Sequence, residues 1–304
     1  MMVPECERTV LVVEDDQEVR DAIAEVLEDS EYKPLPAANG AEALERLRTA
    51  TPQPCVILLD VMMPTMDGWQ FRAAQQSDPA ERKLIENLPG CIAWLERLDT
   101  ADRTDIRAVL QTIVKGQELD LRRFGDPATA VPLKRAAELE EYTYLVAGCV
   151  GEFWTNLGFR CLPRFARRSP DEMKKLGIDY GKGLQLINIL RDRGVDEKNG
   201  RIYFPPSEDI SSWMDRAETQ TRAGIEYASS LTNWRTRFAT ALPALIGART
   251  IALLHAAGLE AGTSTVKVPR PEVRRILFNA ALATASPSSL RSLFERLLEV
   301  RLPA

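Results

Sequence analysis

The stretch GKGLQLINILRDRGVDEKNGRIYFP, residues Gly181–Pro205, decides how the larger part of this 304-residue chain is interpreted. In a helix, Gln185, Asn188 and Asp192 fall at positions i, i+3 and i+7, so they share one face. Asp196 lies one turn further on, provided that the helix continues that far. Leucine and isoleucine fill most of the remaining positions. The stretch therefore predicts a buried helix with one polar stripe.

A polar stripe of this kind is costly to bury unless its amide and carboxylate groups are bound. Mg²⁺ would satisfy it, because this ion commonly takes one or two carboxylates and completes its shell with water and phosphate oxygens. Four cations close to the stripe could bind a diphosphate: Arg191, Arg193, Lys198 and Arg201. The sequence predicts a magnesium–diphosphate site here. The alternative is a surface helix end with ordinary salt bridges.

A second informative stretch is EYTYLVAGCVGEFW, residues Glu141–Trp154. Gly148 and Gly151 lie three residues apart in an otherwise good helix, where each costs about 1 kcal/mol relative to alanine. This cost indicates close approach of another helix or of a ligand chain, and packing between helices alone remains the simpler alternative. Tyr142 would need a partner for its hydroxyl if buried, and its ring could stabilise a carbocation.

The two ends of the chain predict different folds. Residues 9–80 alternate strand and helix signals, which predicts a partial α/β segment with a three-stranded parallel sheet. The expected strands and helices are Thr9–Val13, Gln17–Glu28, Tyr32–Ala38, Ala41–Leu47 and Cys55–Leu59. From residue 81 to the C-terminus the pattern is helix after helix, with breaks expected at Pro89 and Pro243 among others, so an all-α domain is predicted. The predicted domains are 1–80 and 81–304.

Acidic residues follow two of the expected strands. Glu14 and Asp15 end the first strand and Asp60 ends the third, and right-handed crossovers would place these strands side by side. Three carboxylates at one edge would repel each other without a hard divalent cation. Such a site can accept a phosphoryl group on a carboxylate. The alternative is that acidic residues end strands because loops are polar.

Composition narrows the class of protein. The hydrophobic fraction of 45% and the charged fraction of 27% are typical of a soluble globular protein, and the net charge of −5 gives no reason to expect nucleic acid as the main partner. No apolar run is judged long enough to span a membrane, and the N-terminus does not resemble a secretory signal. Five scattered cysteines are interpreted as reduced thiols, and the single histidine, His255, as a packed core residue. A cytoplasmic location is expected.

Three motifs in residues 9–80 resemble the response regulator receiver domain. They are TVLVVEDD (Thr9–Asp16), ANGAEAL (Ala38–Leu44) and VILLDVMMPTMDG (Val56–Gly68). The resemblance implies that Asp60 is the phospho-acceptor, that Glu14, Asp15 and the backbone carbonyl of Met62 hold Mg²⁺, and that a histidine kinase is a partner. A receiver's last two strands have no counterpart in the sequence, so the segment is expected to be truncated and to leave a sheet edge open.

The helical part is similar to the squalene/phytoene synthase family. YTYLVAGCVG (Tyr142–Gly151), GLQLINILRD (Gly183–Asp192) and GRIYFP (Gly200–Pro205) carry the resemblance, which covers residues from about 81 to 304. Weaker support comes from GQELDL (Gly116–Leu121) and VKVPRPEVRRIL (Val266–Leu277). The resemblance implies an isoprenoid-synthase-like helical fold and head-to-head condensation of two prenyl diphosphates, either farnesyl or geranylgeranyl diphosphate. Mg²⁺ would assist loss of diphosphate, and squalene-forming members also use NADPH.

The family's site roles carry over to matching positions of this chain. The implied catalytic residues are Tyr142, Asn188, Asp192 and Asp196, of which the last three would also hold Mg²⁺. The implied diphosphate-binding residues are Gln185, Arg191 and Arg201. Tyr142 would lie near the cation or take part in proton transfer.

One departure from the family bears on activity. The early helices with the family's first Asp-rich motif have no counterpart, since the receiver-like segment occupies their place. Asp99, Asp102 and Asp105 echo that motif only superficially, because they fall between helices and at a helix start. We therefore expect low or no synthase activity from this chain alone. The alternatives are a phospho-acceptor regulatory protein and a fusion without function; membrane contact is expected to be peripheral at most.

Overall fold

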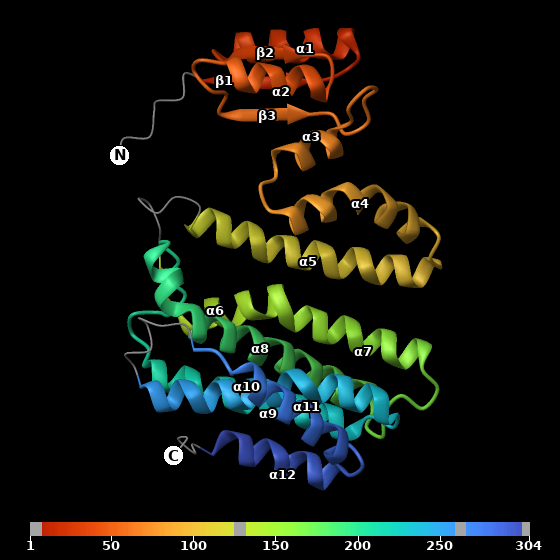
Figure 1. Ribbon diagram of the computed structural model, residues 1–304, viewed down its shortest axis with the longest axis vertical. Helices are drawn as coiled ribbons and strands as arrows, with labels where there is room; N and C mark the ends of the chain where they lie inside the picture. Colours follow the sequence, from red (N-terminus) through yellow and green to blue (C-terminus); the bar gives the residue numbers. More distant parts are fainter. Residues whose placement is uncertain (1–7, 125–131, 259–265, 300–304) are drawn as a thin grey trace. The chain divides into compact units, whose positions relative to one another are not determined.

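The computed structural model describes residues 8–124, 132–258 and 266–299 (Figure 1). By its internal contacts the chain divides into two compact units, one ending at Asp99 and the other beginning at Thr100. We describe each unit by itself.

The first unit contains the predicted parallel sheet. Its strands are β1 (Thr9–Val13), β2 (Lys33–Ala37) and β3 (Val56–Leu59), in the order β2-β1-β3. The central strand β1 is buried along its whole length, as expected for a β-branched run paired on both sides. The prediction that the first and third strands lie side by side is confirmed, with Val10 opposite Val56 and Val13 opposite Leu59.

Four helices accompany this sheet: α1 (Gln17–Asp29), α2 (Gly40–Thr49), α3 (Gly68–Gln75) and α4 (Pro79–Glu96). Each begins where a short polar side chain caps the free backbone N–H groups. The capping residues are Asp16, Asn39, Asp67 and Asp78. Phe71 of α3 and Ala43 of α2 pack on Leu11 and Val13 to form the core of the unit.

One side of the sheet is open, as the truncated pattern predicted. Among the described residues, no strand pairs with the outer edge of β3. Val56 and Leu58 on that strand are exposed, as are Val19 and Val26 on α1. These side chains would be covered in a sheet that continued beyond β3.

The second unit is the predicted all-α domain. Its helices are α5 (Thr100–Phe124), α6 (Ala136–Thr143), η1 (Tyr144–Gly148), α7 (Cys149–Cys161), α8 (Pro170–Lys198), α9 (Ile210–Ser230), α10 (Trp234–Ala257), α11 (Arg270–Ala283) and α12 (Pro287–Leu298). The long helix α8 packs against α7 and η1 and against α9 and α10. Ser169 and Glu172 form a capping box at its start, and Pro170 occupies its first position, where a proline needs no N–H partner. This central helix carries the polar stripe.

Several local expectations were wrong. Pro89 and Pro243 do not break the chain but lie inside α4 and α10. His255 is exposed in the last turn of α10 and is not a core residue. Cys55 is disulfide-bonded, so it is not a reduced thiol, whereas Cys91, Cys149 and Cys161 are free. The remaining cysteine lies outside the described residues.

Helix α10 bears on the expectation that no apolar run is long enough to span a membrane. Among the described helices it is the one long and apolar enough to cross a membrane by length and composition. Half of its most apolar window is buried, and Ala241, Ala244, Leu245 and Ala248 form part of the core of the second unit. Helix α10 is thus part of the core of the second unit.

Candidate active site

The polar stripe of α8 has the predicted continuity. The helix runs through to Lys198, so Gln185, Asn188, Asp192 and Asp196 all lie on one element. The apolar residues between them are buried: Leu186, Ile187, Ile189 and Leu190. Asn188 is exposed, and the other members of the stripe are half-buried. The stripe therefore borders open space, while the apolar residues between its members lie in the core.

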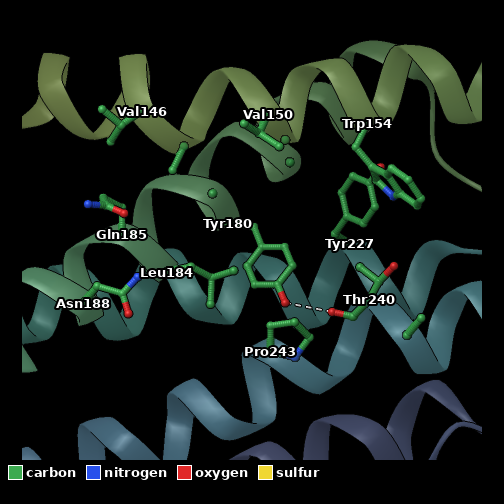
Figure 2. A pocket seen from close by; sticks show the side chains of 15 residues that line it. Val146, Val150, Trp154, Tyr180, Leu184, Gln185, Asn188, Tyr227, Thr240 and Pro243 are labelled. Carbon is green, nitrogen blue, oxygen red and sulfur yellow. Dashed lines mark hydrogen bonds between the residues drawn. The ribbon is translucent and has the colours of Figure 1, made fainter. Parts of the chain in front are cut away.

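An apolar pocket of about 540 Å³ begins at this stripe. Figure 2 shows Gln185 and Asn188 at one end, and Trp154, Tyr227 and Thr240 toward the other. The wall between these ends is apolar and comes from η1, α7, α8 and α10; it includes Val146, Val150, Leu184 and Pro243. The pocket is shaped for an apolar chain with a polar head group beside α8.

Paired glycines bring the two sides of this pocket together. A side chain carbon on Gly151 would lie 1.9 Å from the carbonyl oxygen of Gly177, and one on Gly181 would lie 2.3 Å from that of Ala147. Only glycine permits backbones to approach this closely. The predicted close approach is thus by α8, and Gly151, Gly177 and Gly181 also line the pocket.

A π-helical turn, η1, precedes these glycines and includes the VAG motif. Its wider turn carries Val146 and Ala147, which line the pocket. Single π turns inside α-helices are frequent at functional sites. The turn adjoins the end of the pocket where Gln185 lies, as Figure 2 shows for Val146.

Two tyrosines are fixed in the wall by hydrogen bonds. The hydroxyl of Tyr180 donates to the backbone carbonyl of Thr240 at 2.8 Å (Figure 2), and the hydroxyls of Tyr227 and Thr155 lie 2.9 Å apart. Burial raises the pKa of both phenols, that of Tyr227 to about 12. Both rings are therefore neutral wall residues at physiological pH.

The carboxylates of the stripe lie in a charged cluster beyond Asn188. Arg191 donates two hydrogen bonds to Asp192, at 2.9 and 2.5 Å. Burial raises the pKa of Asp196; the Arg201 guanidinium opposes this, and the carboxylates of Asp192 and Asp120 add to it. The protonated form of Asp196 is therefore favoured mainly by its burial.

Tyr142 belongs to a hydrogen-bond network that shares Asp120 with this cluster. Its hydroxyl lies 3.4 Å from that of Tyr203, which donates to Asp120 at 2.6 Å. The two rings stack with their centroids 5.2 Å apart. Burial is the main cause that raises the pKa of Tyr142 to about 12. The predicted hydroxyl partner is present, but Tyr142 does not line the large pocket.

Asp120 was missed as a candidate residue. It receives the Tyr203 hydroxyl, lies 3.8 Å from the Arg201 guanidinium, and raises the pKa of Asp196. The motif GQELDL, which ends one residue after Asp120, was noted only as weak support and was the available signal.

The residues on α8 fit a hydrated magnesium ion rather than a closed cage. Burial, and then the carboxylates of Asp192 and Asp120, raise the pKa of Asp196, and a divalent cation bound there would lower it. Within the described ranges, however, the one group of three or more acidic residues whose ligand oxygens all lie within 4.8 Å of one another is elsewhere. Mg²⁺ usually keeps several waters and binds through one or two carboxylates, so it does not require such a group of three.

That other acidic group is the predicted one in the first unit, formed by Glu14, Asp15 and Asp60. The Met62 N–H donates to Asp60 at 3.2 Å, and Arg20 donates to the backbone carbonyl of Glu14 at 2.6 Å. The side chains meet at the edge of the sheet where β1 and β3 end. The predicted juxtaposition is present; the roles of Asp60 and Met62 stay predictions.

The DTADRTD segment has a structural role in the fold. Asp102 and Asp105 lie in the first turns of α5, and Arg160 of α7 binds both at 2.5 Å. These ion pairs join α5 to α7 and involve neither the pocket nor the stripe. Asp102 and Asp105 thus serve a contact between helices.

Sequence comparison finds similarity to two families. The profile of "Squalene/phytoene synthase" matches residues 59–209, and that of "Response regulator receiver domain" matches residues 10–85. A 4,4'-diapophytoene synthase of Staphylococcus haemolyticus is 46% identical over 66 residues, which is 22% of this chain and 21% of that protein. A squalene synthase of Gibberella zeae is 26% identical over 172 residues, 54% of this chain and 35% of that protein.

A bifunctional lycopene cyclase/phytoene synthase of Phaeosphaeria nodorum is 36% identical over 102 residues, 33% of this chain and 16% of that protein. The chain thus spans about a third or less of the length of these curated relatives. Among solved structures, TcSQS with the ligand BPH1237 superposes with a TM-score of 0.59 at 20% identity, over 73% of this chain and 69% of that one. The chain is therefore similar to the response regulator receiver domain over residues 10–85 and to the squalene/phytoene synthase family over residues 59–209.

Proposed function

We propose that the helical unit binds a prenyl diphosphate as part of a head-to-head prenyltransferase. One observation carries this proposal: an apolar pocket of about 540 Å³ ends at Gln185 and Asn188, from which the polar stripe continues along α8 to Asp192 and Asp196. An isoprenoid chain would occupy the pocket, and its diphosphate would lie on the stripe. Farnesyl and geranylgeranyl diphosphate are the substrates of this class.

The proposed roles follow from position and charge. Asn188, Asp192 and Asp196 would hold Mg²⁺, which when bound would stabilise the charge of a leaving diphosphate. Gln185 and Arg201 would bind diphosphate oxygens. Arg191 now neutralises Asp192, so it can turn to the diphosphate when a cation takes over that carboxylate. Mg²⁺, Arg191 and Arg201 would then stabilise the negative charge that develops on the leaving diphosphate.

The pocket wall and Tyr142 would have different tasks. The wall would exclude water from a reactive allylic cation. Tyr142 remains protonated at neutral pH because of its raised pKa, so its ring, stacked on Tyr203, offers neutral π-density rather than a base. NADPH enters this proposal only for a squalene-forming reaction, in which it would reduce the coupled product.

We further propose that turnover is weak in this chain. Val150 and Trp154 line the pocket but are 41% and 46% exposed, so water reaches it from that side. A single acidic stripe also provides less charge for ionisation than the two acid-rich motifs of the family. We take the synthase-like part as residues 81–304, although packing groups residues up to Asp99 with the first unit.

Incubation of the full chain with Mg²⁺ and farnesyl or geranylgeranyl diphosphate tests this proposal. We expect product formation close to background. The assay should quantify both the hydrocarbon product and released diphosphate, since simple hydrolysis in a wet pocket would release diphosphate alone. Turnover to a thirty- or forty-carbon product at the rate of an intact synthase would contradict the proposed impairment.

A second candidate function rests on the acidic group of Glu14, Asp15 and Asp60, whose ligand oxygens lie within 4.8 Å of each other. We propose it as a Mg²⁺-dependent phospho-acceptor site with a histidine kinase as partner. With acetyl phosphate, this function predicts acid-stable, base-labile labelling of the wild type and none of Asp60→Asn. Asp67→Asn is a suitable control, because Asp67 caps α3 and is not in the group. Without uptake in the wild type, this candidate is eliminated.

A further inference from the structure

Helix α11 presents a mixed apolar and basic face to solvent. Phe278 and Leu282 are 66% and 64% exposed, although both are large hydrophobic residues. Ile276, Ala280 and Ala283, on the other side of the same helix, are buried in the core with residues of α10 and α12. One side of α11 is therefore packed in the core, and this packing holds the side with Phe278 and Leu282 toward solvent.

Helical spacing places the exposed apolar residues between cations. Phe278 lies four residues after Arg274 and three after Arg275, so the two arginines flank it on either side. Leu282 follows one turn later on the same face. An apolar ridge with cations on both flanks is the pattern of a helix that lies in a membrane interface.

The charge of this face is strongly positive. Lys267, Arg270, Arg274 and Arg275 are all exposed. The acidic residue among positions 266–283 is Glu272, which is half-buried and forms an ion pair of 2.7 Å with Arg249 of α10. Glu272 also lies 3.6 Å from Arg275. Since Arg249 already balances Glu272, the face remains cationic in a chain whose net charge is −5.

We propose that this face of α11 is the docking surface of the helical unit on an anionic lipid bilayer. The cations would approach lipid phosphates, and Phe278 and Leu282 would enter the boundary between head groups and acyl chains. Charge complementarity selects an anionic partner. The two apolar side chains lie in the middle of this face, which favours a lipid surface over nucleic acid. Nucleic acid would be bound by the cations alone. The proposal does not depend on the prenyltransferase function.

Sedimentation of the full chain with vesicles tests this surface. We expect binding to phosphatidylcholine vesicles that contain about 30% phosphatidylserine, and weak binding to phosphatidylcholine alone. Arg274→Gln with Arg275→Gln should weaken binding by roughly tenfold or more, because each cation near an anionic bilayer contributes severalfold. Phe278→Ser with Leu282→Ser should weaken it by roughly tenfold as well.

Matched variants in other helices control for charge and apolarity. Lys83→Gln with Arg107→Gln removes two exposed cations, and Leu84→Ser removes a leucine that is also 64% exposed. Both control variants should bind vesicles as the wild type does. All changes are at exposed positions, and circular dichroism establishes that each variant is folded.

Other outcomes would overturn the proposal. Equal losses in the control variants would show that any exposed cation or leucine matters. Binding without dependence on phosphatidylserine would remove the role of the arginines. If Phe278→Ser with Leu282→Ser instead converts an oligomer to a monomer in light scattering, or if the arginine pair governs binding to an RNA or DNA duplex but not to vesicles, the face serves another partner.

Discussion

Gly151→Ala is expected to destabilise the helical unit by about 3 kcal/mol, the upper part of the range for overpacked cores. The new methyl carbon would lie 1.9 Å from the carbonyl oxygen of Gly177 and 2.4 Å from its carbonyl carbon. Both are backbone atoms of α8, so they cannot turn away as a flexible side chain could. Helices α7 and α8 would have to separate, and the pocket between them would change shape.

Gly90→Ala is the matched control for this prediction. Gly90 also lies inside a helix, but a methyl group there would meet nothing within 4 Å. Alanine should therefore stabilise α4 by roughly 0.5–1 kcal/mol, because it restricts the unfolded chain and favours helix. Urea denaturation gives the two free energies, and hydrogen exchange of peptides from α4, α7 and α8 assigns each effect to its unit. Stabilisation by Gly151→Ala would refute the close approach of the two backbones.

Asp192→Asn combined with Asp196→Asn is expected to lower the Mg²⁺-dependent affinity for a prenyl diphosphate by about a hundredfold. Each lost charged contact costs about 1.5 kcal/mol, and two correspond to two factors of ten in the dissociation constant. The affinity measured without Mg²⁺ should change little or even improve, because the variant removes two negative charges close to the diphosphate. Calorimetric titration with a thiolodiphosphate analogue, with and without Mg²⁺, separates these effects.

Asp171→Asn combined with Asp215→Asn is the control for charge. Both carboxylates are exposed in the same unit, and neither lies on the stripe of α8. This pair should bind the analogue as the wild type does in both conditions. If the control pair loses as much affinity, the loss is caused by the change in net charge and not by the stripe. The assignment of Asp192 and Asp196 would then be wrong.

Features that depend on local spacing could be predicted from the sequence. The three parallel strands follow from short apolar runs, and the meeting of Glu14, Asp15 and Asp60 follows from the handedness of crossovers. The stripe of α8 follows from a period of about four residues. Each of these predictions needed only neighbouring residues or one topological rule.

Contacts between distant residues could not be predicted in this way. The hydrogen bond from Tyr203 to Asp120 joins residues 83 positions apart, and the pairing of Tyr142 with Tyr203 spans 61. Nothing in the local pattern shows that Tyr142 packs in this network rather than in the large pocket. Gly151 illustrates the same limit, since its cost predicted a close neighbour but could not distinguish helix α8 from a ligand chain.

Predictions that relied on the usual behaviour of a residue type failed where packing decides. Pro243 lies within α10, whose following residues Ala244, Leu245 and Ala248 are buried in the core. Proline removes one backbone hydrogen bond, a loss that burial on this scale offsets. His255 lies at the end of the same helix, where the apolar pattern continues but the neighbouring elements no longer cover it.

Photolabelling tests the central claim most directly, namely that a prenyl chain occupies the pocket with its diphosphate on α8. A farnesyl diphosphate analogue with a photoreactive group at the far end of its chain would be bound with Mg²⁺, irradiated and mapped by mass spectrometry. The account predicts labelling of peptides that contain Val150, Trp154 or Thr240, and loss of labelling in Asp192→Asn with Asp196→Asn. Labelling confined to peptides outside the pocket, or equal labelling of that variant, would contradict it.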